Sequence, residues 1–138
     1  MTIFLTHDAG LKHVPPQGHP ERVARLEAIY RALGAEEFAG LDRRAAPLAD
    51  ETETLRCHDP AHLDRIRAAA PVQGWAALDG DTFMSPGSLE AALRAIGGVE
   101  AAIDAVLAGQ ARNAFIAMRP PGHHAERDRA MGFCLFST

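Results

Sequence analysis

The hydrophobic and polar positions of the chain divide it into short apolar runs and longer one-sided patterns. Residues 2–6 (TIFLT) form a β-rich run that predicts a first buried strand. Residues 113–118 (NAFIAM) form an apolar run without alternation, which is typical of a strand covered on both faces. A weaker edge strand is predicted at Arg44–Ala49.

Helical periodicity separates these strands. A helix that opens near Pro20 and ends at Gly34 is predicted from apolar residues on one face: Val23, Leu26, Ile29 and Leu33. Shorter helices are predicted from a capping box at Asp50 and from Asp59-Pro60, the second running to about Ala70. The longest predicted helix spans Ser88–Ala108, and its Gly97-Gly98 pair favours close packing against a neighbour.

The order of strands and helices predicts an α/β domain with a largely parallel sheet, formed by residues 1–138 as one unit. Ligands in such folds sit beyond the carboxyl ends of the strands. Two loops occupy these places, His7–His19 after the first strand and Arg119–Met131 after the last. We therefore look for chemistry in these loops.

Composition narrows the function classes. A net charge of −4 and a pI of about 5.9 argue against a general nucleic-acid-binding surface. No apolar run approaches the ~20 residues that span a bilayer, and the N-terminus lacks the pattern of a signal peptide. Two cysteines, Cys57 and Cys134, make no disulfide framework, so we expect a reducing, cytoplasmic location.

The segment at 119–136 (RPPGHHAERDRAMGFCLF) carries the most informative residues. A rigid Pro-Pro-Gly turn is followed by His123 and His124, and two histidines at a strand end can act as a base and its electrostatic partner. A histidine pair in a loop is more often a surface feature. The residues around the pair decide between these interpretations.

Five motifs, in order along the chain, resemble the histone deacetylase superfamily, which also includes acetoin-utilisation proteins and acetylpolyamine amidohydrolases. They are HPER at 19–22, CHDP at 57–60, DGDTFMSPGSLEAAL at 79–93, RPPGHHA at 119–125 and GFCLF at 132–136. The resemblance implies an arginase/deacetylase-type three-layer fold, of which this chain would be the N-terminal portion. The RPPGHH form resembles the class II-like and bacterial branch.

The resemblance also implies roles for individual residues. His124 matches the general base that later acts as an acid, and His123 matches its partner. Four further residues match the substrate channel: Gly132 and Phe133 in its wall, Arg22 near its foot and Asp81 in its rim loop. The substrate class implied is acetyl-lysine or acetylpolyamine.

Metal binding is where the chain departs from the family pattern. The family binds Zn²⁺ through an Asp-x-His pair and a later Asp, and a tyrosine follows. No Asp-x-His occurs in the 138 residues, and the single tyrosine is Tyr30, in the first predicted helix. We therefore expect an N-terminal portion of a zinc-dependent deacetylase that is inactive and zinc-free by itself, without the C-terminal metal-binding half.

A non-catalytic protein is the alternative, a free-standing fragment that binds a partner or oligomerises. The outer edge of the 113–118 strand would be unpaired, and a second copy or a separate C-terminal half would cover it. We expect a homodimer that buries Phe115 and part of the Phe133–Phe136 run.

Other polar residues are interpreted structurally. His7, His13 and His19 fit no zinc motif. His58 and His62 are expected in capping or packing roles, Arg119 is expected to pair with a carboxylate, and both cysteines are expected to be inert buried thiols.

Overall fold

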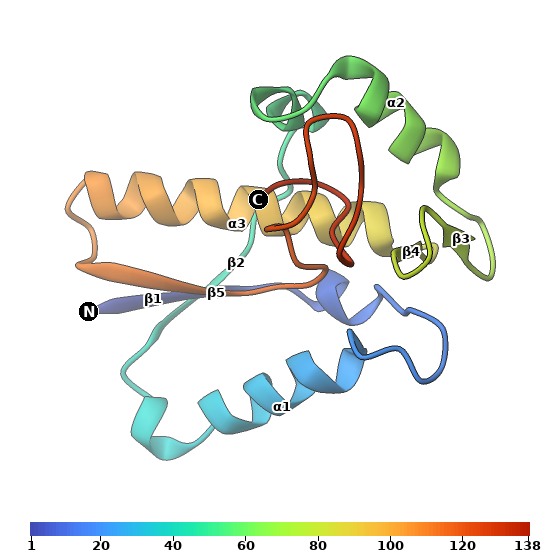
Figure 1. Cartoon of the computed structure of the whole chain (residues 1–138). Coiled ribbons are helices and arrows are strands. Elements are labelled where there is room, and N and C mark those ends of the chain that lie inside the picture. Colours follow the sequence, from blue (N-terminus) through green and yellow to red (C-terminus); the bar gives the residue numbers. More distant parts are fainter.

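A three-stranded parallel sheet forms the centre of the computed structural model, which describes all residues 1–138 (Figure 1). Its strands are β1 (Thr2–Thr6), β2 (Asp42–Ala45) and β5 (Asn113–Ala117), in the order β2–β1–β5. β1 pairs in parallel with both neighbours. The predicted α/β class and the mainly parallel sheet are confirmed.

Helices cover both faces of this sheet and give the fold three layers. α3 (Ser88–Leu107) lies on one face and α1 (Val23–Leu33) on the other (Figure 1). Because side chains alternate along a strand, Ile3 and Leu5 of β1 pack against α3, while Phe4 packs with Leu26 of α1. Each fully buried side chain of this size stabilises the fold by about 1.5–3 kcal/mol.

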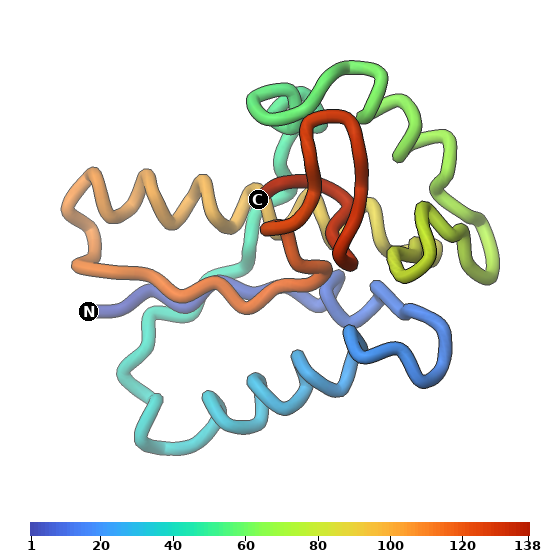
Figure 2. The backbone as a smooth tube through the Cα atoms, in the orientation of Figure 1, coloured from blue at the N-terminus to red at the C-terminus, as the bar shows by residue number.

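A second hydrophobic core packs the end of the chain against α2 (Pro60–Ala69) (Figure 2). A short antiparallel pair, β3 (Ala76–Ala77) and β4 (Phe83–Met84), lies beside it. Three 3-10 helices complete the chain: η1 (Asp8–Leu11), η2 (Glu36–Phe38) and η3 (Glu51–Arg56). This second core contains side chains of α2, β4, α3 and the end of the chain. They are Leu63, Ile66, Met84, Leu93, Leu135 and Phe136.

The glycine pair of α3 makes the close contact that its sequence predicts. A Cβ on Gly97 would lie 2.3 Å from the Pro47 carbonyl oxygen, and one on Gly98 would lie 3.2 Å from the Ala46 Cβ. α3 therefore crosses the segment after β2 at a distance that only glycine permits.

Two strands differ from their predictions. β2 begins at Asp42 and ends at Ala45, whereas Arg44–Ala49 was expected. β5 is not covered on both faces, because Phe115 is 49% exposed although its ring stacks on Phe4. Part of the Phe133–Phe136 run was expected in a dimer interface. Leu135 and Phe136 are instead buried within the chain itself.

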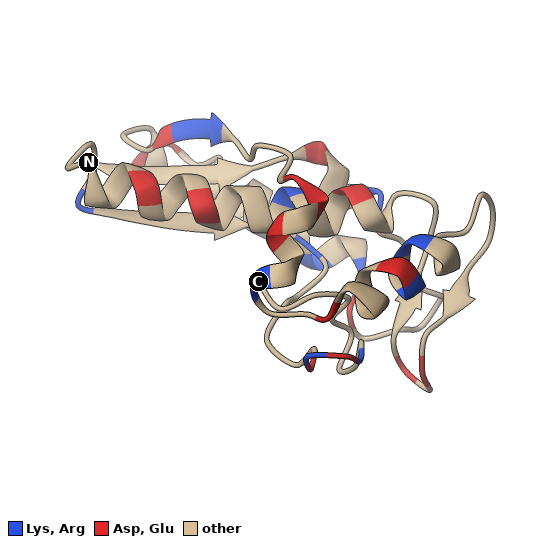
Figure 3. Cartoon of the chain, turned by 90° about the horizontal axis from the view of Figure 1, so that it is seen from above, with Lys and Arg blue, Asp and Glu red and all other residues tan.

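Charged residues are spread over several elements. Figure 3 shows acidic residues along α3 and a basic segment at β2. Arg44 of this segment is paired with Asp42, at 2.6 Å. No helix is long and apolar enough to cross a membrane.

Candidate active site

The two adjacent histidines lie in a loop that follows β5, here named the histidine loop (residues 119–137). His123 and His124 are both exposed, and their rings are tilted against each other with centroids 4.2 Å apart. No hydrogen bond involves either imidazole ring. The pair is thus accessible beyond the end of β5.

The backbone of His124 is held by the returning limb of the loop. Its N–H donates to Sγ of Cys134 at 3.4 Å, and the Cys134 thiol in turn contacts the Gly132 carbonyl at 3.3 Å. Gly132 lies so close that a Cβ there would be 2.6 Å from the His124 Cβ. Cys134 is buried as expected, whereas Cys57 is exposed, contrary to expectation.

Phe133 adopts a left-handed backbone and is tied to the rim loop. Its φ is 71°, a conformation that bulky residues rarely adopt, and its N–H donates to Oγ1 of buried Thr82 at 3.1 Å. The His19 ring meets the Phe133 ring edge-on at 4.7 Å. His19 Nε2 also donates to the Asp81 carbonyl at 2.7 Å, so the expected rim and channel residues lie together.

Sequence reasoning missed Thr82 and His19 at this place. Thr82 lies within the rim motif and His19 opens the HPER motif, so both motifs were available as signals. Their side-chain contacts join segments more than 50 residues apart in the chain, and no local pattern reports such contacts.

A buried ion pair forms the base of the site. Arg119 makes two hydrogen bonds to the Glu21 carboxylate, at 2.5 and 2.7 Å, and donates to the carbonyls of Gly10 and His13. His13 adds a contact to Glu21 at 3.3 Å, and its other ring nitrogen lies 2.6 Å from Ser88 Oγ. The structural role expected for Arg119 is confirmed.

The charge of Glu21 is stabilised by these neighbours. Burial by itself raises the pKa of this carboxyl group, but the hydrogen bonds and positive charges of His13 and Arg119 lower the pKa to about 2. Glu21 is therefore an anion at neutral pH, and its partners prevent it from acting as a proton donor there.

Arg22 makes none of these contacts. It is exposed and immediately precedes α1. A cavity of about 130 Å³ at the start of the histidine loop is lined by Arg25 and Arg119, together with Glu21 and Pro121. Arg25 is exposed as well, but it lines this cavity and Arg22 does not.

The donor set does not make a zinc site. Zinc sites usually have three or four protein ligands, and no three His, Cys, Asp or Glu side chains of the chain converge to hold a metal ion. His123 and His124 offer two nitrogens at most. We therefore derive no chemical step through a metal from these residues.

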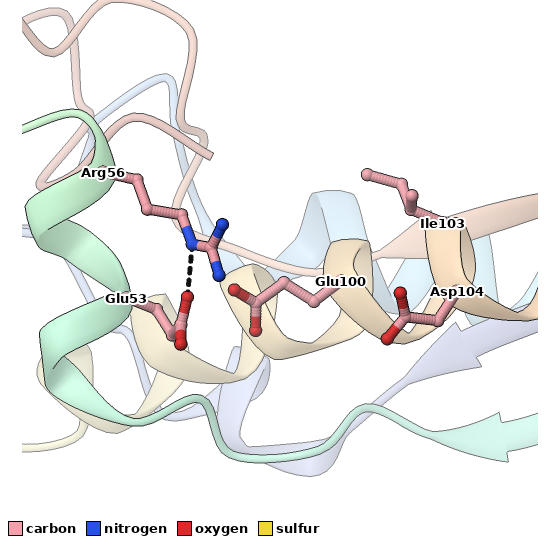
Figure 4. Close-up of a pocket in the computed structure, with 5 residues that line it drawn as sticks. All are labelled: Glu53, Arg56, Glu100, Ile103 and Asp104. Atoms are coloured by element: carbon pink, nitrogen blue, oxygen red, sulfur yellow. Dashed lines mark hydrogen bonds and ion pairs between the residues drawn. The ribbon is translucent and has the colours of Figure 1, made fainter.

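Another cavity, of about 420 Å³, lies between η3 and α3 (Figure 4). Arg56 pairs with Glu53, and burial together with the Glu53 charge raises the pKa of Glu100. This cavity contains none of the expected site residues. The residues that line it are Glu53, Arg56, Glu100, Ile103 and Asp104. The chemistry of the molecule is thus concentrated at the histidine loop, where an accessible imidazole pair stands on a rigid base and can exchange protons.

Known proteins are similar to this chain over most of its length. The family model of the histone deacetylase domain matches residues 19–138. The histone deacetylase-like amidohydrolase of Pseudomonas aeruginosa is 42% identical over 119 residues, which are 86% of this chain and 30% of that protein. A probable deacetylase of Methanothermobacter thermautotrophicus is 37% identical over 125 residues, covering 88% of this chain and 36% of its own length.

The fold has a solved counterpart. The crystal structure of the HDA15 HD domain superposes with a TM-score of 0.89 at 28% identity, covering 98% of this chain and 41% of that one. The chain thus spans well under half the length of these three proteins. With the family model matching most of its residues, the chain belongs to the histone deacetylase family.

Proposed function

We propose that this chain supplies the proton-transfer groups and part of the substrate channel of a zinc-dependent deacetylase. The observation that carries the proposal is the exposed His123–His124 pair, which contacts Cys134 and Gly132 and follows the buried Arg119 by four residues. His124 acts as base and then as acid, and His123 is its electrostatic partner. Positioned proton transfer of this kind contributes roughly 10²–10⁴-fold to a rate.

The channel roles follow the geometry around the pair. Gly132 and Phe133 form its wall and Asp81 its rim, because His19 brings the rim loop against the Phe133 ring. Arg25 lines the cavity next to Arg119 and Arg22 does not, so Arg25 suits the foot of the channel better. The substrate we propose is an acyl amide on a slim side chain, as in acetyl-lysine or an acetylpolyamine.

Zinc is part of the proposal as the Lewis acid that polarises an amide carbonyl and activates water. Its ligands would come from parts of the family domain that lie outside the residues matched by this chain. The chain alone is then expected to be inactive, and we place no metal on its histidines.

A chimera tests the proposal. Residues 1–138 replace the matching segment of the Pseudomonas relative, and hydrolysis of acetyl-lysine and acetylpolyamine substrates is measured with zinc and with a chelator. We expect zinc-dependent turnover that His124→Ala lowers by roughly 10²–10⁴-fold while zinc content stays unchanged. Turnover that resists the chelator, or an active His124→Ala chimera, contradicts the proposal.

A second candidate function is binding without catalysis. The outer edge of β5 is unpaired, Phe115 is half exposed, and an apolar groove of about 300 Å³ runs between α3 and β5. We propose that a second copy covers this edge in a two-fold dimer, since an unpaired strand edge favours pairing with another strand. Light scattering over a dilution series tests this, and a monomer of 14.8 kDa at high micromolar concentration contradicts it.

A further inference from the structure

Two buried histidines outside the proposed reacting pair contact the histidine loop. His58 follows η3 and His62 lies in the first turn of α2, and they are only 4% and 1% exposed. Their rings stack with centroids 4.5 Å apart, and both meet the Phe136 ring edge-on at 5.7 Å. A purely apolar core would not need two imidazoles here, so their polar contacts require an explanation.

The His58 ring bridges the two limbs of the histidine loop. Its Nδ1 lies 3.2 Å from the carbonyl oxygen of Arg127 on the outgoing limb. Its Nε2 lies 2.7 Å from the backbone nitrogen of Ser137 on the returning limb. His62 contacts the returning limb as well, since its Nε2 donates to the Leu135 carbonyl at 2.9 Å.

These partners determine the protonation state of His58. A carbonyl oxygen only accepts, so Nδ1 must carry the hydrogen, and a backbone N–H only donates, so Nε2 must offer its lone pair. Both contacts are satisfied together only by the neutral ring with its proton on Nδ1. A second proton, on Nε2, would point at the Ser137 N–H and remove that hydrogen bond.

The surroundings favour the same neutral form. Burial, with a smaller contribution from His62, lowers the pKa of His58 below its ordinary value of 6.5. The other groups that face the ring are the Arg127 and Glu126 backbone and the Asp59 carboxylate, and these act in the opposite direction without reversing the shift. Asp59 is itself paired with the exposed Arg127 side chain, at 2.7 Å.

A short backbone path leads from His58 to the reacting pair. The residue after Ser137, Thr138, donates its N–H to the Gly122 carbonyl at 2.9 Å. A Cβ on Gly122 would lie 2.0 Å from Thr138 Oγ1, so the two segments are in direct contact. Gly122 immediately precedes His123, and the position of the returning limb therefore constrains the start of the histidine pair.

We propose that His58 is a positioning residue for His123 and His124, and that protonation of His58 releases the returning limb that holds them. The role rests on the proposed function, in which these two histidines transfer protons. It adds a pH dependence that does not come from the titration of the pair itself. The pair loses its placement as the pH falls through the lowered pKa of His58.

Nuclear magnetic resonance of the 138-residue chain with ¹⁵N-labelled histidine tests the proposal without any turnover assay. At neutral pH we expect His58 to be the Nδ1–H tautomer. On acidification, protonation of His58 should speed amide exchange at Ser137, relative to the intrinsic exchange rate at each pH, by roughly 5- to 30-fold, as expected for the loss of one hydrogen bond. The ring signals of His123 and His124 should show an extra step at the same pH.

Two variants separate positioning from simple packing. His58→Phe keeps a ring but deletes both hydrogen bonds, and we expect fast exchange at Ser137 at every pH with no extra step at the pair. His58→Gln keeps an acceptor near the position of Nε2 but does not titrate, so slow exchange should return while the step stays absent. If His58→Phe does not fold, the wild-type titration and His58→Gln carry the test.

The opposite results overturn the proposal. They are an Nε2–H tautomer at His58, or signals of His123 and His124 that keep the same pH profile in His58→Gln. Because no readout uses turnover, an inactive chimera would contradict the proposed deacetylase and leave the positioning role standing. A His58 titration without the expected changes would contradict the positioning role and leave the proposed deacetylase standing.

Discussion

Arg119 and His123 lie four residues apart, yet their side chains are in opposite situations. Arg119 is 5% exposed, and its guanidinium makes four hydrogen bonds to Glu21, Gly10 and His13. His123 and its neighbour His124 are exposed, and no hydrogen bond reaches either ring. A buried charge is tolerated only when it is paired, whereas a proton-transfer group must remain accessible.

The contrast shows that the base of the site is complete within this chain, while the two histidine rings make no hydrogen bond. His124 is held by the hydrogen bond of its own N–H and by the close approach of Gly132 to its Cβ and ring. Stability and chemistry should therefore respond to different substitutions, and the variants below test that separation.

Removal of Arg119 should have the largest effect on folding. Arg119→Met leaves the Glu21 carboxylate buried without its main partner, and breaking such a pair costs about 3–5 kcal/mol. The free energy of unfolding, measured in urea, should fall by this amount. Arg127→Met is the matched control, because Arg127 is 79% exposed in its pair with Asp59 and should change stability by less than ~1 kcal/mol.

Acid should weaken the same network. The pKa of Glu21 in the fold is about 2 against an ordinary 4.5, so its contribution is complete above pH 4.5 and is lost as the pH falls towards 2. A shift of this size corresponds to roughly 3 kcal/mol at most. Urea unfolding through this range checks it. Glu21→Gln should be less stable throughout but should lose this part of the slope, and an unchanged slope would contradict the assignment.

Removal of the reactive pair should have the smallest effect on folding. His123→Ala and His124→Ala delete exposed rings that make no hydrogen bond, so each should change the free energy of unfolding by no more than ~0.5 kcal/mol. Thermal and urea unfolding of the 138-residue chain measure this. A loss of several kcal/mol would mean that the rings are anchored, and the contrast with Arg119 would fail.

The elements that the sequence predicts well are those with a strong apolar repeat. β1 has the predicted bounds, and α3 begins at the predicted residue and ends within one residue of the predicted end, because their buried faces show directly in the spacing of apolar residues. β5 differs from its prediction because an unbroken apolar run does not require two covered faces. Ala114 and Ile116 do pack against the α3 side, but nothing covers Phe115 fully on the other.

The site divides in the same way between local and long-range information. His123, His124, Gly132 and Phe133 were identified through short motifs, and the structure brings them together. Arg25 lines the cavity beside Arg119 and Arg22 does not, and the HPER motif alone does not say which side of the helix start faces that cavity. The bridging role of His58 depends on Ser137, 79 residues away, and no local spacing encodes it.

The contact between α3 and the segment after β2 has a consequence for protein engineering. Replacing a helical glycine by alanine usually stabilises a helix by about 1 kcal/mol, so propensity scales would nominate Gly97 and Gly98 first. Here the added methyl group at position 97 would overlap the Pro47 carbonyl and force the helix off the sheet. A library built on helix propensity would therefore fail at its most favoured position, and Gly97 marks where the mutational tolerance of this helix is set by its neighbour.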